Sequence, residues 1–302
     1  MSQLTKGYLI ALVGITIWST TGVLISYLIT NYAIPALLLA FWRNLLVCVA
    51  LVPIFYLVRR SLLRIDKTQI GYYALYGFVL AVFNSIWTVS VQANGAAVAT
   101  VLGYSSAGFT AILAWWFFKE QLRLPKIIAI TLSLIGCVLV SRAYSPDMWN
   151  LNPLGIATGL ATGVLFAIYN MLGKQAAQRK LNPWTVLLYS FAFGALFTLL
   201  FNVASILLSG TQSLAALLPD LPLNGWLVLI ILSFIPTVLG FGLYNTSMNY
   251  LPATTASLIA TSEPAMTAVE AYLFLGERMT LVQIIGSLII LSAVILMRFQ
   301  KD

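Results

Sequence analysis

The chain has 302 residues, of which 61% are hydrophobic and 8% charged, with a mean hydropathy of +0.96. Soluble domains carry about 25% charged residues, so this composition excludes an ordinary soluble domain and indicates a polytopic membrane protein. The net charge of +8 does not call for nucleic acid, because basic residues hold the cytoplasmic loops of membrane proteins. We expect a small-molecule substrate and the lipid bilayer as partners, with no obligatory protein partner.

The chain has no His and two Cys, Cys48 and Cys137, each within an apolar stretch. This excludes a disulfide framework and argues against a transition-metal site, so we expect neither a metal nor a cofactor. The first residues, MSQLTKGYLI, run directly into a stretch too long for a signal-peptide core. We therefore expect an uncleaved first helix.

Ten apolar stretches, each near the roughly 20 residues that a bilayer needs, follow one another along the chain. They cover about 7–29, 36–58, 70–92, 95–118, 125–142, 153–173, 184–208, 225–248, 253–275 and 280–298. The connections are short except for residues 209–224, which we interpret as an interfacial helix. The predicted fold is all-α integral membrane, with ten transmembrane helices.

The positions of Lys and Arg orient these spans. With the N-terminus inside, thirteen of the sixteen Lys and Arg residues fall in inner segments, and Arg142 and Arg278 fall in outer loops. The remaining one, Arg43, lies within the second span. Because inner loops are enriched in Lys and Arg, we expect a multi-pass protein of the cell membrane with both termini cytoplasmic.

The two halves of the chain are similar when one is shifted along the other by 157 residues. The shift superposes Ala96 on Ala253 and Glu120 on Glu277 without a gap, so that WWFFKEQL matches YLFLGERM. Each half has five spans, an odd number, so the halves must insert with opposite orientation. Such inverted repeats are the architecture of secondary transporters. We predict two five-helix repeats, 1–145 and 150–302, around a central cavity, with chance similarity among apolar helices as the alternative.

Two carboxylates lie in the ninth span, where a bilayer penalises charge. Glu263 and Glu270 are seven residues apart, so they share one helical face with Thr267 between them. Pro264 removes the backbone hydrogen bond to the carbonyl of Ala260, which predicts a kink. The first half has a serine and a leucine at the two equivalent positions, so repeat symmetry does not explain the acids.

We interpret Glu263 as a cation or proton site, with a structural hydrogen bond at the kink as the alternative. Glu270 is either its companion or a carboxyl that reaches water or pairs within the bundle. Glu120 and Glu277 end their helices and are interpreted as boundary anchors and hinge contacts. Arg43 can pair with Glu263 or with a substrate carboxylate. The alternatives are a tether between two helices and an arginine that snorkels to the outer membrane surface.

Aromatic and amide side chains on the inner helices complete the predicted site. A lone amide in a membrane helix more often bonds a neighbouring helix, but aromatics and amides that converge from four helices indicate a cavity wall. The predicted substrate-binding residues are Glu263, Trp18, Thr21, Asn84, Trp87, Tyr104, Tyr169, Tyr244, Asn245 and Thr267. The predicted proton- or charge-coupling residues are Glu263, Glu270 and Arg43. A separate stripe, Gly155, Gly159 and Gly163, predicts close helix packing.

The pattern E-P-x-x-x-A-x-x-x-x-x-x-L-G-E from Glu263 to Glu277 resembles the ninth helix of EamA-type transporters in the drug/metabolite transporter superfamily. AFWRNLL around Arg43 resembles that family's second helix, and IWSTTGVLIS its first. The first-half segment GYSSAGFTAILAWWFFKEQL departs from the family, which usually has Pro where Ala107 stands and Gly where Lys119 stands. The resemblance implies a ten-helix basket that exports amino acids and other metabolites, as YddG-like exporters of aromatic amino acids do.

Two acids against one Arg leave an inner charge of about −1, which disfavours nucleotide sugars and sugar phosphates because polyanions need several basic residues. A zwitterionic amino acid, a small amine or an amphipathic organic cation fits better, and the aromatic faces offer cation–π contacts. We expect a secondary transporter that works by alternating access. The alternatives are a passive facilitator or a flippase for a lipid-linked substrate, and a non-transport membrane scaffold. The absence of a nucleophile–base pair argues against an enzyme.

Overall fold

The computed structural model describes residues 2–145, 153–208, 217–275 and 279–298, and the regular elements in these ranges are all helical. The α-helices are α1 (Gln3–Tyr32), α2 (Ala36–Val58), α3 (Ile70–Tyr104), α4 (Ser106–Phe118), α5 (Leu124–Val140), α6 (Pro153–Gln178), α7 (Pro183–Leu208), α8 (Leu223–Leu232), α9 (Gly242–Ser247), α10 (Ala253–Ala260), α11 (Glu263–Leu275) and α12 (Leu281–Arg298). The 3₁₀ turns η1 (Arg60–Leu63) and η2 (Lys67–Gln69) link α2 to α3, and the π-helix η5 (Ser233–Phe241) joins α8 to α9. The predicted all-helical class is confirmed.

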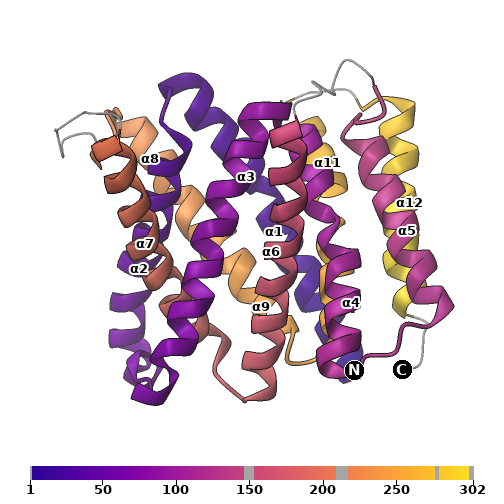
Figure 1. Ribbon diagram of the computed structural model, residues 1–302, viewed down its shortest axis with the longest axis horizontal. Coiled ribbons are helices and arrows are strands. Elements are labelled where there is room, and N and C mark those ends of the chain that lie inside the picture. Colours follow the sequence, from indigo (N-terminus) through magenta and orange to yellow (C-terminus); the bar gives the residue numbers. More distant parts are fainter. Residues whose placement is uncertain (1, 146–152, 209–216, 276–278, 299–302) are drawn as a thin grey trace.

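Seven helical stretches of the described residues are long and apolar enough to cross a membrane, and α5 and α12 are shorter apolar helices. The chain is therefore a multi-pass membrane protein. In Figure 1, α1 begins and α12 ends at the same, lower side of the bundle, which we call the terminus face. The interfacial helix expected over 209–224 falls partly outside the described residues.

The third and fourth predicted spans share a helix that is longer than expected. α3 has 35 residues, which would measure about 52 Å if straight, against about 30 Å of bilayer hydrocarbon. It does not run straight, because a Cβ added to Gly159 of α6 would lie 2.9 Å from Oγ of Ser90 and 2.8 Å from Cβ of Leu102. Those two residues would be about 18 Å apart on a straight helix, so the chain changes direction between them. The boundary expected near residue 93 coincides with this change of direction, although the helix itself continues to Tyr104.

The helix breaks of the two halves fall at equivalent positions. α4 runs from Ser106 to Phe118 and α11 from Glu263 to Leu275, so both have 13 residues. Their starts and their ends are each 157 residues apart, which is the offset at which the two half-sequences are similar. α5 and α12 begin with the same offset.

The helices α5 and α12 pack together at one edge of the bundle through a glycine in each (Figure 1). A Cβ added to Gly136 would lie 2.5 Å from Cγ1 of Ile290 and 2.8 Å from the carbonyl oxygen of Gly286. The Nε2 of Gln283 also donates a hydrogen bond to the carbonyl of Val140 at 3.2 Å. Small residues allow this close approach, as is usual between membrane helices.

The glycine stripe of α6 has the packing role that was predicted for it. A Cβ added to Gly163 would lie 3.1 Å from the carbonyl oxygen of Leu102, and Gly159 has Leu102 and Ser90 as its neighbours. Gly159 and Gly163 therefore let α3 approach the α6 backbone.

Gly136→Ala should lower the free energy of unfolding by about 1–3 kcal/mol, because the added methyl group overpacks the contact between α5 and α12. The midpoint of thermal unfolding in detergent micelles measures the effect. Gly108→Ala in α4 is the matched control, since a Cβ there meets no atom within 4 Å and Ala favours a helix over Gly. Equal midpoints for the two variants would contradict the close contact.

Candidate functional site

A break in the ninth predicted span places a carboxylate inside the bundle. α10 ends at Ala260 and α11 begins at Glu263, with residues 261–262 forming the turn between them. Pro264 is the second residue of α11, where its missing N–H interrupts no helical bond. The kink predicted from Pro264 is confirmed. Because Glu263 stands in the first turn of α11, its carboxylate is favoured by the helix dipole.

The carboxylate of Glu263 is held by the other half of the chain. The hydroxyl of Tyr104, the last residue of α3, donates a hydrogen bond to it. At the offset of 157 residues, Tyr104 corresponds to Thr261, which lies in the break between α10 and α11. The Thr261 hydroxyl bonds that of Ser133, and its carbonyl accepts a bond from the Cys137 thiol at 3.5 Å. The two helix breaks therefore meet, and a side chain from one binds the carboxylate at the other.

The second carboxylate, Glu270, contacts α1. The Ser19 hydroxyl donates to Oε1 of Glu270 at 2.7 Å, and the Thr267 hydroxyl donates to the Ser19 carbonyl at 3.1 Å. The other oxygen, Oε2, is buried and has no hydrogen-bond partner among the described residues. Ser19 was not predicted as a site residue, since a serine in a helix ordinarily bonds its own backbone. Ser19 does that too, at 2.6 Å to Thr16, so helical spacing alone gives no signal for its contact with Glu270.

Arg43 is a tether between helices. Its side chain is buried, and Nη2 donates a hydrogen bond to Oδ1 of Asn84 on α3 at 3.1 Å. Within the described ranges, the ion pair of the structure joins Lys126 to Glu120, and Arg43 has no carboxylate within 4.0 Å. Arg43 therefore does not pair with Glu263 in this structure and tethers α2 to α3, while pairing with a substrate carboxylate stays a prediction. In the described part of the chain, Nε of Arg43 is buried without a hydrogen-bond partner, and so is the hydroxyl of the predicted residue Thr21.

The predicted aromatic residues converge, and they pack against one another. The Trp18 ring centroid lies 4.2 Å from that of Phe241 and 5.5 Å from that of Tyr244. Tyr169 and Tyr244 are fully buried. These rings therefore close the middle of the bundle on the side of η5 and α9, where an open cavity wall was expected.

Amide groups join the aromatic cluster to both halves. The Tyr244 hydroxyl donates to Oδ1 of Asn170 at 2.8 Å, and Nδ2 of Asn170 donates to Thr110 at 3.3 Å and Ser257 at 3.2 Å. Asn245 donates to the Tyr169 hydroxyl at 3.3 Å. These amides make interhelical hydrogen bonds, the role that a lone amide most often has.

Trp87 lies on α3 and is half-buried. Among the described residues it has no ring contact with the aromatic cluster and no hydrogen bond to either carboxylate. In the part of the chain that the structure describes, no hydrogen bond or ring contact therefore joins Trp87 to the other predicted site residues, and the same is true of Thr21.

The terminus face is closed at the turn between α9 and α10, where two helix ends carry opposite partial charges. Lys174 of α6 lies at the carbonyl end, with Nζ donating to the carbonyl oxygens of Met248 at 3.0 Å and Leu251 at 2.7 Å. The same turn packs on the start of α1, because a Cβ added to Gly7 would lie 2.7 Å from Cβ of Tyr250. A cation thus stabilises the carbonyl groups that the end of α9 leaves unbonded.

Glu120 holds the amide end of the same turn. Its Oε1 accepts from the backbone N–H of Ala253 at 2.7 Å, and its Oε2 accepts from the Thr254 hydroxyl at 2.7 Å. Nζ of Lys126 lies 3.9 Å from Oε2, and the side chains of Lys126 and Glu120 are only 3% and 11% exposed. The contact fits the hinge role predicted for Glu120, whereas Glu277 lies outside the described residues. We call Glu120, Lys126 and Lys174 the terminus-face clamp.

Comparison with known proteins identifies the family. Residues 5–142 and 153–299 each match the EamA-like transporter family. The chain belongs to that family. It is a membrane transporter, and each half of the chain carries one copy of the family's sequence pattern.

Relatives in this family agree with the assignment. The chain is 26% identical to a probable amino-acid metabolite efflux pump of Escherichia coli K12, over 95% of this chain and 93% of the relative. It is 29% identical to the threonine/homoserine exporter RhtA of Salmonella typhimurium, over 76% and 72%, and 29% identical to an uncharacterized transporter of Archaeoglobus fulgidus, over 78% of each. One crystal structure superposes with a TM-score of 0.78 at 15% identity, covering 97% of this chain and 96% of that one, which shows a shared fold.

Glu120→Ala should lower the free energy of unfolding by about 3–5 kcal/mol, because it leaves the buried Lys126 unpaired and α10 without its cap. The midpoint of chemical or thermal unfolding in micelles measures this. Asp66→Ala is the matched control. The Asp66 carboxylate also accepts from a backbone N–H, that of Thr68 at 3.0 Å, which holds the pKa of Asp66 below its usual range, but Asp66 is exposed.

The Asp66 variant should lose much less stability than the Glu120 variant, as expected for an exposed cap. The double variant Glu120→Ala/Lys126→Met should recover part of the Glu120 loss, since no unpaired charge remains. Equal losses for the Glu120 and Asp66 variants would contradict the buried clamp.

Proposed function

We propose that this transporter exports small zwitterionic metabolites, in the first place amino acids, by alternating access between two inverted five-helix repeats. The observation that carries the proposal is the buried carboxylate of Glu263 at a helix break, held by Tyr104 at the equivalent break of the other half. Transporters build their substrate sites at discontinuous helices where two repeats meet. The hydrogen bond between Tyr104 and Glu263 therefore joins the two repeats, which must move relative to one another during transport.

Several features support ten spans in two repeats, 1–145 and 150–302. α3 with α4 supplies two spans, since the chain changes direction between Ser90 and Leu102. The series α8, η5 and α9 supplies one, and α10 with α11 supplies another. Each half then has five spans, and an odd number requires opposite insertion of the two units. α11 begins 157 residues after α4, and α12 begins 157 residues after α5, as two copies of one repeat would.

The Lys and Arg bias supports a cytoplasmic terminus face. The terminus-face clamp and the packed rings of Trp18, Phe241 and Tyr244 then close the cytoplasmic side of the site. An exporter must open this side to load substrate, so release of the clamp is the step that admits the substrate.

The chemistry of the site supports a zwitterionic substrate. Glu263 and the unbonded Oε2 of Glu270 can accept hydrogen bonds from an ammonium group. The buried Arg43 keeps an unbonded Nε for a carboxylate. Relatives are named as exporters of threonine and homoserine and of amino-acid metabolites, and the Trp18 cluster suits an aromatic or cationic side chain as well.

Coupling to a proton or another cation is assigned to the same groups. An ammonium group that binds Glu263 competes with the Tyr104 hydroxyl for the carboxylate, so substrate binding and the bond between the two breaks are linked. Glu270 and Arg43 are the further charges within the bundle that a coupled ion would meet.

Glu263→Gln should lower the rate of amino-acid transport about tenfold or more, because a charge-assisted hydrogen bond to the substrate is worth about 1.5–3 kcal/mol. Purified protein in liposomes, with threonine and phenylalanine counterflow as the readout, measures the rate. Tyr104→Phe is the matched control, since it removes the same hydrogen bond from the other side and keeps the carboxylate. It should retain more activity than the Gln variant.

Undiminished transport by the Gln variant would sink the assignment of Glu263. Counterflow that is identical with and without an imposed proton gradient would identify a passive facilitator. A wild-type protein that moves no amino acid or organic cation in either assay would favour a flippase or a scaffold on the same fold.

A further inference from the structure

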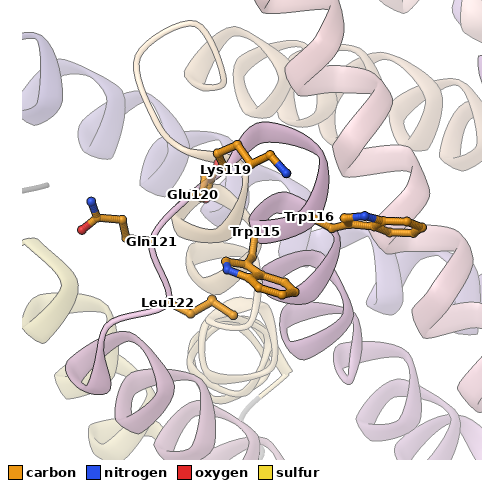
Figure 2. A pocket seen from close by; sticks show the side chains of 6 residues that line it. All are labelled: Trp115, Trp116, Lys119, Glu120, Gln121 and Leu122. Atoms are coloured by element: carbon orange, nitrogen blue, oxygen red, sulfur yellow. The ribbon is translucent and has the colours of Figure 1, made fainter.

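A pocket at the terminus face lies apart from the Glu263 site. It has a volume of about 520 Å³ and opens where α4 ends and the chain turns toward α5. Its walls are Trp115, Trp116, Lys119, Glu120, Gln121 and Leu122 (Figure 2). Of these six residues, only Glu120 belongs to the terminus-face clamp and so has a role in the proposed transport mechanism. The other five have no role in it.

Lys119 occupies a backbone conformation that does not suit a lysine. It follows the last residue of α4 with φ 58° and ψ 29°, the left-handed region, where any side chain strains the backbone and glycine does not. At the offset of 157 residues the second half has Gly276. The attraction between a lysine and the negative end of the helix dipole is similar in size to the cost of the left-handed backbone. The two energies cancel, so the position at the helix end does not by itself favour a lysine over a glycine. Ala33, Arg142 and Lys180 have the same conformation, so a function of Lys119 depends on the charge and shape of the pocket beside it.

The free charge of the pocket is positive. Lys119 is exposed and forms no ion pair within the described residues. The carboxylate of Glu120 beside it is already engaged by Ala253, Thr254 and Lys126. Arg123 follows the pocket residues in sequence, and its Nε donates to Oε1 of Gln121 at 2.7 Å.

Two tryptophans give the pocket an apolar side. Trp115 and Trp116 are 55% and 62% exposed on the last turn of α4. Indole rings at the end of a spanning helix favour the boundary between hydrocarbon and headgroups. In Figure 2 the Trp116 ring and the Gln121 amide mark the two sides of the pocket. A ligand that matches it carries an anion beside an apolar chain.

We propose that this pocket binds the headgroup of an anionic phospholipid from the leaflet at the terminus face. The phosphate lies at the Lys119 ammonium, and the acyl chains run along Trp115 and Trp116. Glu120 forms one wall of the pocket and caps α10 at the same time. The bound lipid therefore packs against the helix end that keeps the terminus face closed.

Native mass spectrometry of the purified full-length protein tests the proposal, with phosphatidylglycerol and phosphatidylcholine of matched acyl chains as the probes. The wild type should retain phosphatidylglycerol about fivefold better, the contribution of one lysine near an anionic surface. Lys119→Gly should remove this preference while relieving the backbone, so the variant remains folded. Lys119→Arg should keep it. Lys67→Gln, which removes an exposed lysine on η2, is the matched control and should also keep it.

An undiminished preference in Lys119→Gly would overturn the site. Displacement of the lipid by free glycerol phosphate at equal concentration would overturn the lipid as its source and assign a soluble anion. The readout is lipid retention, so it is independent of whether the protein moves amino acids.

Discussion

The structure depends on one constraint, that no polar group can be left to hydrocarbon where a helix is broken inside a membrane. The break between α10 and α11 frees backbone groups and carries the Glu263 carboxylate, and side chains from other helices satisfy both. The Tyr104 hydroxyl donates a hydrogen bond to the carboxylate, and the Cys137 thiol donates one to the carbonyl of Thr261. The turn between α9 and α10 is treated in the same way, by Lys174 at its carbonyls and Glu120 at its amides. The helices are held in place by these polar contacts as much as by apolar packing.

The two halves share a frame and differ in their charges. α4 and α11 have the same length and offset, yet Glu263 stands where the first half has Ser106, and Lys126 corresponds to Gln283. A repeat explains where the breaks fall, and it leaves each break free to acquire its own chemistry. The carboxylates of Glu263 and Glu270 occur only in the second half and Lys126 of the clamp only in the first, whereas Glu120 has an equivalent in Glu277. Because the charges are unequal, the two faces of the bundle need not open with equal ease.

Sequence reasoning found the features that depend on local or periodic signals. Pro264 predicts the break, and the offset of 157 predicts which positions in the two halves correspond. The sequence does not predict the partner of Arg43, because its hydrogen bond to Asn84 depends on how α2 and α3 pack against each other. The contact of Ser19 with Glu270 has no sequence signal at all. Of the predicted aromatic residues, Trp18, Tyr169 and Tyr244 converge, but whether rings line a cavity or fill it is set by the relative position of the halves.

The short helix α4 connects the parts of the molecule that carry chemistry. It starts next to Tyr104, which bonds Glu263, and it ends next to Glu120, which caps α10. Thirteen helical residues span about 20 Å and move as one body, so a displacement at one end reaches the other. In the proposed transport cycle, opening the clamp would pull on the Tyr104–Glu263 bond, and a substrate that binds Glu263 in place of Tyr104 would loosen the helix that leads to Glu120. The same helix also carries the exposed Trp115 and Trp116, so the proposed lipid would act on this body as well.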